Sequence, residues 1–467
     1  MVDSLVSTVA LIRVFSEKLT TLQATLSAYT QWAAVAAKQA RVRRKVTSRS
    51  TGRHLAVLVS DFPPTITGGV YRPLSIIQYA CASGWRATII TRETNAVPSG
   101  ASDYLLSSLS ANVKVIRVLG PEREPSFRWF PRIQGESLQH ALSMIDVGLD
   151  TFLRDAPSAV FASGPLFNSF VAALSLSKTL KVPMVLDYRD EWTEWPFGIF
   201  PIGKSDHDWE RRCVDHASAI FFTTTSQLEN QMLAYPEVNR LKCHIVPNGW
   251  EPSDFSGLEI GTHTRRQARH DGRFLISYVG VFGGHIDVRG FLDQLDAVFS
   301  RRPDIAHRLL IRIIGAKDRW VADRIAASEH RESFELLDQV PKNVANRYMV
   351  ESDSLLLVYT GLFGRYVPGK LYDYIAARRP ILLYGIEGEA TSIVRQLHAG
   401  LIVRPDETAE LEQALDKLLM QSSAPEDDAT THEAWLRQHT RTAISQSVVE
   451  IIDTVLYDHS PQPPEKN

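Results

Sequence analysis

The stretch FLISYVGVFGG, residues 274–284, decides the fold that we expect for this chain. It is a continuous apolar run that ends in glycines, and it restarts an alternation of strands and helices that has already run once along the chain. Continuous apolar runs that alternate with helical segments are typical of a parallel sheet covered on both faces by helices. The sequence therefore predicts two α/β units in tandem, each built on a doubly wound parallel sheet.

The other expected strands are short apolar runs of the same kind. Seven lie before this stretch: HLAVLVSDF (54–62), ATIITRE (87–93), VKVIRVL (113–119), SAVFASG (158–164), PMVLDYRD (183–190), AIFFTTTS (219–226) and CHIVPNG (243–249). Four follow it: LLIRIIGA (309–316), SLLLVYTG (354–361), PILLYG (380–385) and AGLIVRP (399–405). Ligands of doubly wound domains bind at the carboxyl ends of the strands, often between domains. We therefore expect an interdomain cleft lined by strand-end loops of both halves.

The changes of pattern divide the chain into five segments. The expected bounds are a helical extension with a basic linker (1–50), a first Rossmann-like domain (51–255), a second Rossmann-like domain (256–430), a C-terminal helix (431–458) and a tail (459–467).

The N-terminal extension contains no proline or glycine between residues 3 and 40, and it runs into the basic stretch RVRRKVTSRSTGR, residues 41–53. An amphipathic helix beside a basic cluster suits an anionic membrane surface. Packing on its own domain or on a second subunit is an equally good interpretation. The apolar residues at helical spacing are Leu5, Val9, Ile12, Phe15, Leu19, Leu22, Leu26 and Tyr29.

Composition limits the partners and the compartment. The 467 residues include 51 Lys+Arg against 53 Asp+Glu, which gives no overall attraction to nucleic acid, so we expect no nucleic-acid partner. The three cysteines, Cys81, Cys213 and Cys243, lie far apart and form no metal or disulfide pattern. No run reaches the roughly 18 apolar residues of a membrane-spanning helix. The sequence therefore predicts a cytoplasmic protein.

The stretch VPGKLYDYIAARRPIL, residues 367–382, carries the clearest ligand signal. Pro368 and Gly369 end a loop, so a helix begins near Lys370, and its unpaired N–H groups together with the lysine charge suit a diphosphate. A magnesium-dependent P-loop needs Ser or Thr after the lysine, whereas this chain has Leu371. Asp373, about one turn later, can accept hydrogen bonds from a ribose diol.

Two loops of the first half also carry unusual residues. In DFPPTITGGVYRP, residues 61–73, the double glycine allows close approach of backbone to a ligand, and an arginine follows it. In VLDYRDEWTEW, residues 185–195, acidic and basic side chains crowd together directly after a strand. They either face a polar cleft or form a structural Arg–Asp pair. No second carboxylate cluster has ligand spacing, so we expect no metal.

These segments resemble the glycosyltransferase family 4-like proteins of the GT-B fold, over roughly His54 to Leu456. The stretches that carry the resemblance are FPPTITGGVYR, PMVLDYRDEW, CHIVPNGWEPSDF, FLISYVGVFGG and VPGKLYDYIAARRPIL. The resemblance implies a nucleotide-sugar-dependent transferase, mostly retaining and without a bound divalent metal, that works in glycan, polysaccharide or glycolipid biosynthesis. It also implies a glycan or lipid-linked acceptor in the first domain, a donor in the second, and no cofactor besides the nucleotide-sugar cosubstrate.

The resemblance also implies roles for single residues. The catalytic candidates are Lys370 and Asp190. The donor-binding candidates are Gly68, Gly69, Gly283, Gly284, Arg289, Arg365, Lys370, Leu371 and Asp373. The acceptor-side candidates are Arg72, Asn168, Asp187 and Arg189. The chain departs from the family pattern where Arg365 occupies the place of a glutamate and Asp373 replaces the usual ribose-binding glutamate.

Two other functions remain open at this point. A nucleotide-sugar epimerase would use the same fold without an acceptor. A catalytically silent GT-B subunit would instead bind a partner enzyme or a membrane through residues 1–50.

Overall fold

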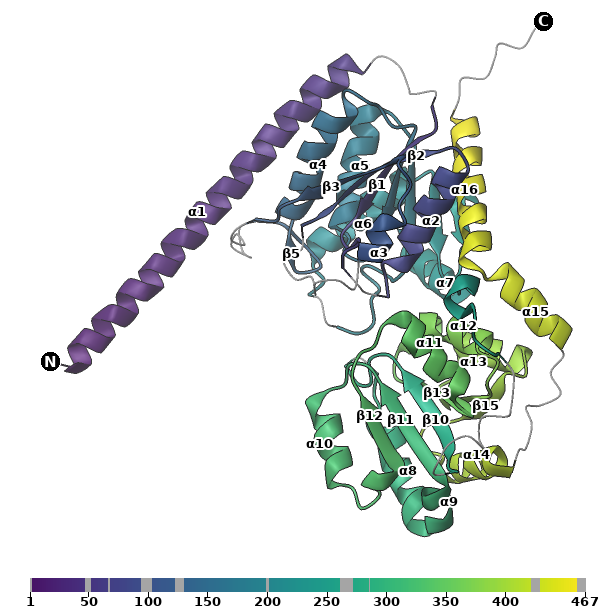
Figure 1. Cartoon of the computed structure of the whole chain (residues 1–467). Helices are drawn as coiled ribbons and strands as arrows, with labels where there is room; N and C mark the ends of the chain where they lie inside the picture. The colour runs from purple at the N-terminus through teal and green to yellow at the C-terminus, as the bar shows by residue number, and fades with distance from the viewer. Residues whose placement is uncertain are drawn as a thin grey trace, which may run out of the picture. The chain divides into compact units, whose positions relative to one another are not determined.

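The computed structural model divides into two compact units, each of which is described by itself (Figure 1). The first contains residues 1–222, 228–246 and 445–467, and the second contains residues 223–227 and 247–444. The structure describes residues 2–46, 52–65, 68–93, 103–121, 130–198, 201–260, 272–284, 286–420 and 429–459, with the side chains of the first helix from Lys18 onward. The middle of the expected basic linker (47–51), most of the expected domain boundary (261–271) and the tail from residue 460 lie outside these ranges.

The first unit is built on a seven-stranded parallel sheet in the order β3-β2-β1-β6-β7-β8-β9. The order reverses between β1 and β6, which is the mark of a doubly wound sheet. The strands are β1 His54–Val59, β2 Arg86–Arg92, β3 Val113–Val118, β6 Ala159–Ser163, β7 Met184–Tyr188, β8 Ala219–Phe222 and β9 Cys243–Ile245. A small antiparallel pair, β4 Arg132–Ile133 and β5 Glu136–Ser137, is separate from this sheet.

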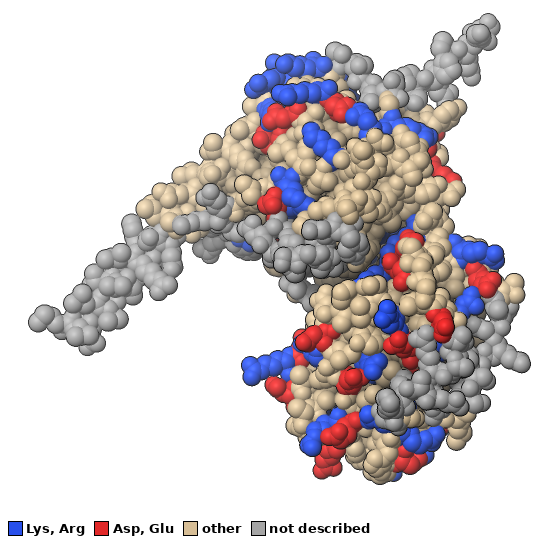
Figure 2. Space-filling view, in the orientation of Figure 1, with Lys and Arg blue, Asp and Glu red and all other residues tan. Residues whose placement is uncertain are grey.

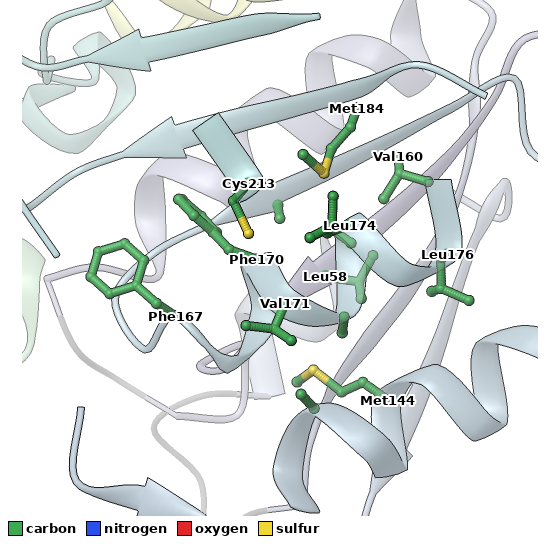
Figure 3. Close-up of a cluster of buried hydrophobic side chains, with 14 of the residues drawn as sticks. Leu58, Met144, Val160, Phe167, Phe170, Val171, Leu174, Leu176, Met184 and Cys213 are labelled. Atoms are coloured by element: carbon green, nitrogen blue, oxygen red, sulfur yellow. The ribbon is translucent and has the colours of Figure 1, made fainter. Parts of the chain in front are cut away.

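Helices cover this sheet, and one apolar cluster joins them to it. Strand residues such as Leu58 and Val160 meet helix residues such as Phe170 and Leu174 in that cluster, as Figure 3 shows. The helices are α1 Val2–Lys45, α2 Tyr71–Ala82, α3 Asp103–Ser107, α4 Gln139–Phe152, α5 Asn168–Leu180, α6 Lys204–His216, α7 Thr225–Ala234 and α16 Arg441–Asp458, with one 3-10 turn, η1 Arg240–Lys242.

The second unit repeats the plan with six parallel strands in the order β12-β11-β10-β13-β14-β15. The strands are β10 Phe274–Val279, β11 Leu309–Ile314, β12 Phe334–Leu337, β13 Ser354–Tyr359, β14 Ile381–Gly385 and β15 Gly400–Val403. The helices are α8 Arg289–Arg301, α9 Pro303–Arg308, α10 Arg319–Ala327, α11 Lys342–Glu351, α12 Gly369–Ala376, α13 Glu389–Gln396, α14 Thr408–Met420 and α15 Ala429–Gln438, and the 3-10 turns are η2 Pro252–Phe255, η4 Arg331–Ser333 and η5 Phe363–Arg365. Acidic and basic side chains are interspersed over the visible face of this unit (Figure 2).

The long helix α1 packs on the first unit through its C-terminal half. Ala28, Val35 and Val42 are at most 2% exposed and belong to the same apolar cluster as the sheet. The amino group of Lys38 lies 2.7 Å from carboxylate oxygens of both Asp146 and Asp150 on α4. The expected helix is confirmed, and part of it packs on its own unit.

The two doubly wound sheets confirm the predicted fold class, and three details differ from the expected elements. Strand β12 and the β4–β5 pair were not predicted, because neither is an apolar run. The expected single C-terminal helix is two helices, α15 and α16, which are separated at His439 and Thr440. Among the described helices, none has both the length and the apolar character that crossing a membrane requires.

Candidate functional site

Lys370 lies at the start of α12, where the sequence places it, and its amino group rests on the end of strand β10. Its Nζ atom is 3.8 Å from the ring centroid of Tyr278 and donates a hydrogen bond of 2.6 Å to the hydroxyl of that tyrosine. The hydroxyl in turn donates to the carbonyl of Val281 at 2.6 Å. A Cβ at Gly280 would lie only 2.9 Å from the lysine Nζ. Gly280 therefore provides the space that the lysine occupies, and a tyrosine instead of an acid supports its amino group.

The surroundings of this amino group favour its neutral form. Burial lowers the pKa of Lys370 from 10.5 to about 7, because removal from water disfavours the charged form. Within the described residues, the lysine has no carboxylate partner that would restore the charge. An anion placed beside the amino group would favour the charged form. A phosphate group is an anion that could make such a charge-assisted contact with a lysine.

Asp373, one turn further along α12, belongs to a second polar cluster. Its side chain is 13% exposed, and its Oδ2 atom lies 3.7 Å from Nζ of Lys342 at the start of α11. The same lysine is 2.7 Å from Asp254. Burial raises the pKa of the Asp373 carboxyl, while Lys342 and Arg441 oppose that rise. Its Oδ1 atom is hidden and has no hydrogen-bond partner in the described part of the chain. This carboxylate is therefore incompletely paired.

The glycines after β10 fit around an aspartate that the sequence did not single out. The N–H of Gly284 donates to Oδ2 of Asp318 at 2.9 Å, and the indole N–H of Trp320 donates to the same oxygen at 3.1 Å. A Cβ at Gly283 would lie 2.6 Å from that oxygen. The guanidinium of Arg289 stacks on Trp320, with its central carbon 4.1 Å from the ring centroid. The loop is thus held by Asp318, and Arg289 lies exposed at the start of α8.

The roles of two further donor candidates stay predictions. The side chain of Leu371 is fully buried in an apolar cluster, and its N–H donates to the carbonyl of Pro368. An apolar side chain on the inner face of α12 packs on the sheet. Arg365 ends the 3-10 turn η5 and is partly buried, with its carbonyl accepting a hydrogen bond from Thr224 of the same unit. Its role stays a prediction.

In the first unit, Arg72 and Asp187 form a buried ion pair. The guanidinium donates to both carboxylate oxygens at 2.7 to 3.1 Å, and the hydroxyl of Ser163 adds a bond of 2.8 Å to Asp187. The two charged side chains are 7% and 0% exposed. The structural Arg–Asp pair that the sequence left open therefore exists. Arg72 and Asp187, two of the four acceptor-side candidates, are therefore buried in this pair. As placed, they support the loop and are hidden from a ligand.

Arg189 is tied to backbone carbonyl groups. It donates to the carbonyls of Gly69 and Gly164, and at 3.1 Å to that of Pro165. A Cβ at Gly69 would lie 2.1 Å from its Nη1 atom, whereas a Cβ at Gly68 would meet nothing within 4 Å. The second glycine of the pair is therefore needed for the approach of the arginine. Burial lowers the pKa of Arg189, and the neighbouring Asp190 and Asp187 oppose this.

Asp190 follows directly after Arg189 in this loop. Burial raises its pKa to about 6, with Glu191 and Asp187 adding to the rise and Arg189 opposing it. Asn168, at the start of α5, is 1% exposed, and its amide donates to Glu136 at 3.4 Å. The structure thus brings Gly69 and Arg189 together, with Asp190 beside Arg189 in the chain, and keeps Asn168 in a separate pair.

Tyr278, Asp318 and Lys342 were missed as site residues. Tyr278 lies inside an apolar run and has the pattern of a core residue. Asp318 follows a strand, as the recognised candidates do, so its position at a strand end was an available signal. Lys342 starts a helix after β12, a strand that was not predicted. Within the described residues, no group of three or more His, Cys, Asp or Glu side chains has the arrangement of a metal site.

Comparisons with known proteins agree with this architecture. The model of the family described as a glycosyl transferase 4-like domain matches residues 67–249. Sucrose-phosphate synthase from Thermosynechococcus elongatus superposes with a TM-score of 0.64 at 12% identity, over 87% of this chain and 100% of that chain. HepE from Anabaena, solved with UDP-glucose, gives 0.61 at 14% identity, over 85% of this chain and 99% of that chain.

A third similar structure is WaaG, a glycosyltransferase involved in lipopolysaccharide biosynthesis, with a TM-score of 0.58 at 14% identity over 85% of this chain and 99% of that chain. No curated protein sequence matches the chain. The domain match lies mostly in the first unit, and the structural likeness covers 85–87% of the chain. Residues 67–249 are therefore similar to a glycosyl transferase 4-like domain, and the chain has the two-unit α/β architecture of the GT-B fold.

Proposed function

We propose that this protein transfers a sugar from a nucleoside-diphosphate sugar to an acceptor hydroxyl, and that the second unit binds the donor. The observation that carries the proposal is the amino group of Lys370, which lies at the start of α12 on the ring of Tyr278 without a carboxylate counter-ion in the described residues. A diphosphate supplies the missing negative charge. The positive end of the α12 dipole favours the same anion.

The reaction needs stabilisation of the leaving group. Breaking the bond between the anomeric carbon and the phosphate oxygen leaves the electron pair on the diphosphate, and positive charge develops on the sugar. Lys370 and the N-terminus of α12 stabilise the developing negative charge in surroundings that are already low in water. Arg289, which is exposed at the start of α8, is the second cation that we assign to the diphosphate. Asp373, with an unsatisfied oxygen, is suited to hold the ribose diol.

The proposal includes a metal-independent, retaining reaction without a further cofactor. Lysine, arginine and the helix end take the charge-neutralising part that magnesium plays in P-loop enzymes. In a retaining transfer the departing diphosphate accepts the proton of the attacking hydroxyl. Asp190, with a pKa of about 6, is charged at neutral pH and is suited to orient that hydroxyl.

The comparisons support a glycosyltransferase over the two alternatives. The matched domain is a glycosyl transferase domain, HepE was solved with UDP-glucose, and WaaG is a glycosyltransferase. Neither an epimerase nor a silent subunit is favoured by these matches. A glycan or lipid-linked acceptor, a cytoplasmic location and contact of residues 1–50 with an anionic membrane stay predictions.

The test is thermal stability against a panel of nucleoside diphosphates and nucleotide sugars, measured on wild type, Lys370→Ala and the control Lys417→Ala. Lys417 is an exposed lysine of α14 in the same unit. A ligand at about 100 times its dissociation constant adds roughly 2.7 kcal/mol to the free energy of unfolding. We expect this gain with one nucleotide class in wild type and Lys417→Ala, and its loss in Lys370→Ala. An equal gain in all three proteins would show that the anion binds elsewhere.

Cleavage of the donor is tested by incubating wild type with the nucleotide sugar that stabilises it, without a glycan acceptor, and measuring the slow release of nucleoside diphosphate as water takes the sugar. Donor binding without release, also in the presence of glycan and lipid-linked acceptors, would favour the silent subunit.

A further inference from the structure

Helix α1 has two apolar faces, of which one is buried on the first unit and the other is about half exposed. The packed face carries Ala28, Val35 and Val42, which are at most 2% exposed. The other face carries Leu19, Leu22, Leu26 and Tyr29, which are 50%, 42%, 59% and 47% exposed. The Tyr29 ring also packs edge-on against Phe130, with 5.2 Å between centroids. We call these four residues the outer stripe.

The spacing of the outer stripe is that of a coiled coil. Its members follow one another at intervals of three, four and three residues, which are alternating a and d positions of a heptad. The same alternation extends upstream in the sequence through Phe15, Ile12, Thr8, Leu5 and Met1. Eight of these nine positions are apolar. A heptad pattern sustained over four repeats indicates pairing with another helix.

The residues beside the stripe favour a helix over a lipid surface. A helix that lies on a membrane has a wide apolar face flanked by Lys and Arg. Where its side chains are described, the seam is bordered by polar residues, namely Lys18, Gln23, Thr25 and Thr30. The four charged residues between 1 and 29 are Asp3, Arg13, Glu17 and Lys18, two of each sign. The basic cluster at the C-terminal end of α1 (Figure 2) begins at Arg41, about 18 Å along the axis from Tyr29.

The seam also fits its own copy. Lys18 is the single charged residue at an e or g position between residues 1 and 30, and in a parallel pair the heptad register sets it opposite Gln23 of the other helix. Two copies therefore bring no like charges together. Residues 2–29 of α1 span about 42 Å, which is four heptads. The packing of Ala28, Val35 and Val42 on the first unit uses a different face and is unaffected.

We propose that α1 joins two copies of this protein in a coiled coil along the outer stripe. The interface is isologous, because the same stripe meets itself across a two-fold axis. It is independent of sugar transfer, so the proposed function and this proposal are tested separately.

The experiment is the molar mass of the full chain by sedimentation velocity over a range of concentrations. The stripe variant is Leu19→Lys/Leu26→Lys, which places charge at two a positions. The matched control is Ser27→Lys/Ala34→Lys, which adds the same charge at two exposed positions off the stripe. Circular dichroism and thermal unfolding verify that all three proteins fold alike.

We expect wild type and the control at twice the chain mass of 52.3 kDa. We expect the stripe variant to dissociate, with a dimer dissociation constant raised at least about 100-fold. A wild type that stays monomeric at tens of micromolar overturns the proposal, as does a dimer that the stripe substitutions leave intact. Flotation with phosphatidylcholine and phosphatidylserine vesicles is the parallel measurement. Binding of a monomeric wild type that the stripe variant loses would assign the stripe to a lipid surface instead.

Discussion

Proton uptake on donor binding is the most direct consequence of the Lys370 environment. Burial lowers the pKa of this lysine to about 7, so the free protein holds the amino group mostly neutral above that pH. A bound diphosphate favours the charged form and raises the pKa again. Binding above pH 7 must therefore take up a proton, and affinity must fall as pH rises.

The size of the effect follows from the same value. With a free pKa of about 7 and a lysine that stays charged in the complex, the dissociation constant rises about 25-fold between pH 6.5 and 8.5. The number of protons taken up per bound nucleotide sugar rises from roughly 0.25 at pH 6.5 to about 1 at pH 8.5.

Calorimetric titration in buffers of different ionisation enthalpy counts these protons. The matched control is Lys370→Arg, because a guanidinium stays charged through this range and can contact phosphate. We expect the arginine variant to bind without proton uptake and with a flat pH dependence. Wild type that binds at pH 8.5 with no proton uptake would refute the assignment of Lys370 to the diphosphate.

Three further predictions concern the first unit. Arg72→Ala should lower the free energy of unfolding by about 3–5 kcal/mol, measured by denaturant titration, because Asp187 would be left buried without its counter-ion; a loss under about 1 kcal/mol would contradict the buried pair. Gly69→Ala should destabilise the protein by about 1–3 kcal/mol, because the added Cβ would displace the guanidinium of Arg189. Gly68→Ala should stay within about 0.5 kcal/mol of wild type. Equal effects of the two substitutions would argue against the close approach of Arg189 to Gly69. The transfer rate should fall below about pH 6 as Asp190 is protonated, and Asp190→Asn should be slow and lack this acid limb; an unchanged limb in the variant would assign it to another group.

The sheets could be predicted because buried parallel strands are uninterrupted apolar runs. HLAVLV and SLLLVY cannot be solvent-facing segments, and each became a fully buried strand. The strand FELL was missed because it lies at the edge of its sheet, where half-exposed positions tolerate a glutamate. Strand prediction therefore worked where the run is mostly apolar, including the edge strands β3 and β15, and failed at β12, where a glutamate interrupts a short run.

The site was predictable in position but not in pairing. The glycine and lysine of α12 mark a helix start in the sequence, and the structure places them there. The partner of Asp187 was beyond sequence reasoning, because Arg189 is two residues away while Arg72, 115 residues away, makes the ion pair. Leu371 was assigned to the donor by the family resemblance, whereas the helical period turns its side chain toward the core.

The return of the C-terminal helix to the first unit affects the order in which the protein can fold during synthesis. Residues 445–467 cluster with the first unit, and Asp453 pairs with Arg53 at 2.9 Å. Residues 247–444 emerge from the ribosome before this last segment, so the second unit can complete its sheet while the first still lacks a helix. Truncation after residue 444 should therefore damage the first unit, although the missing residues follow the second in the chain.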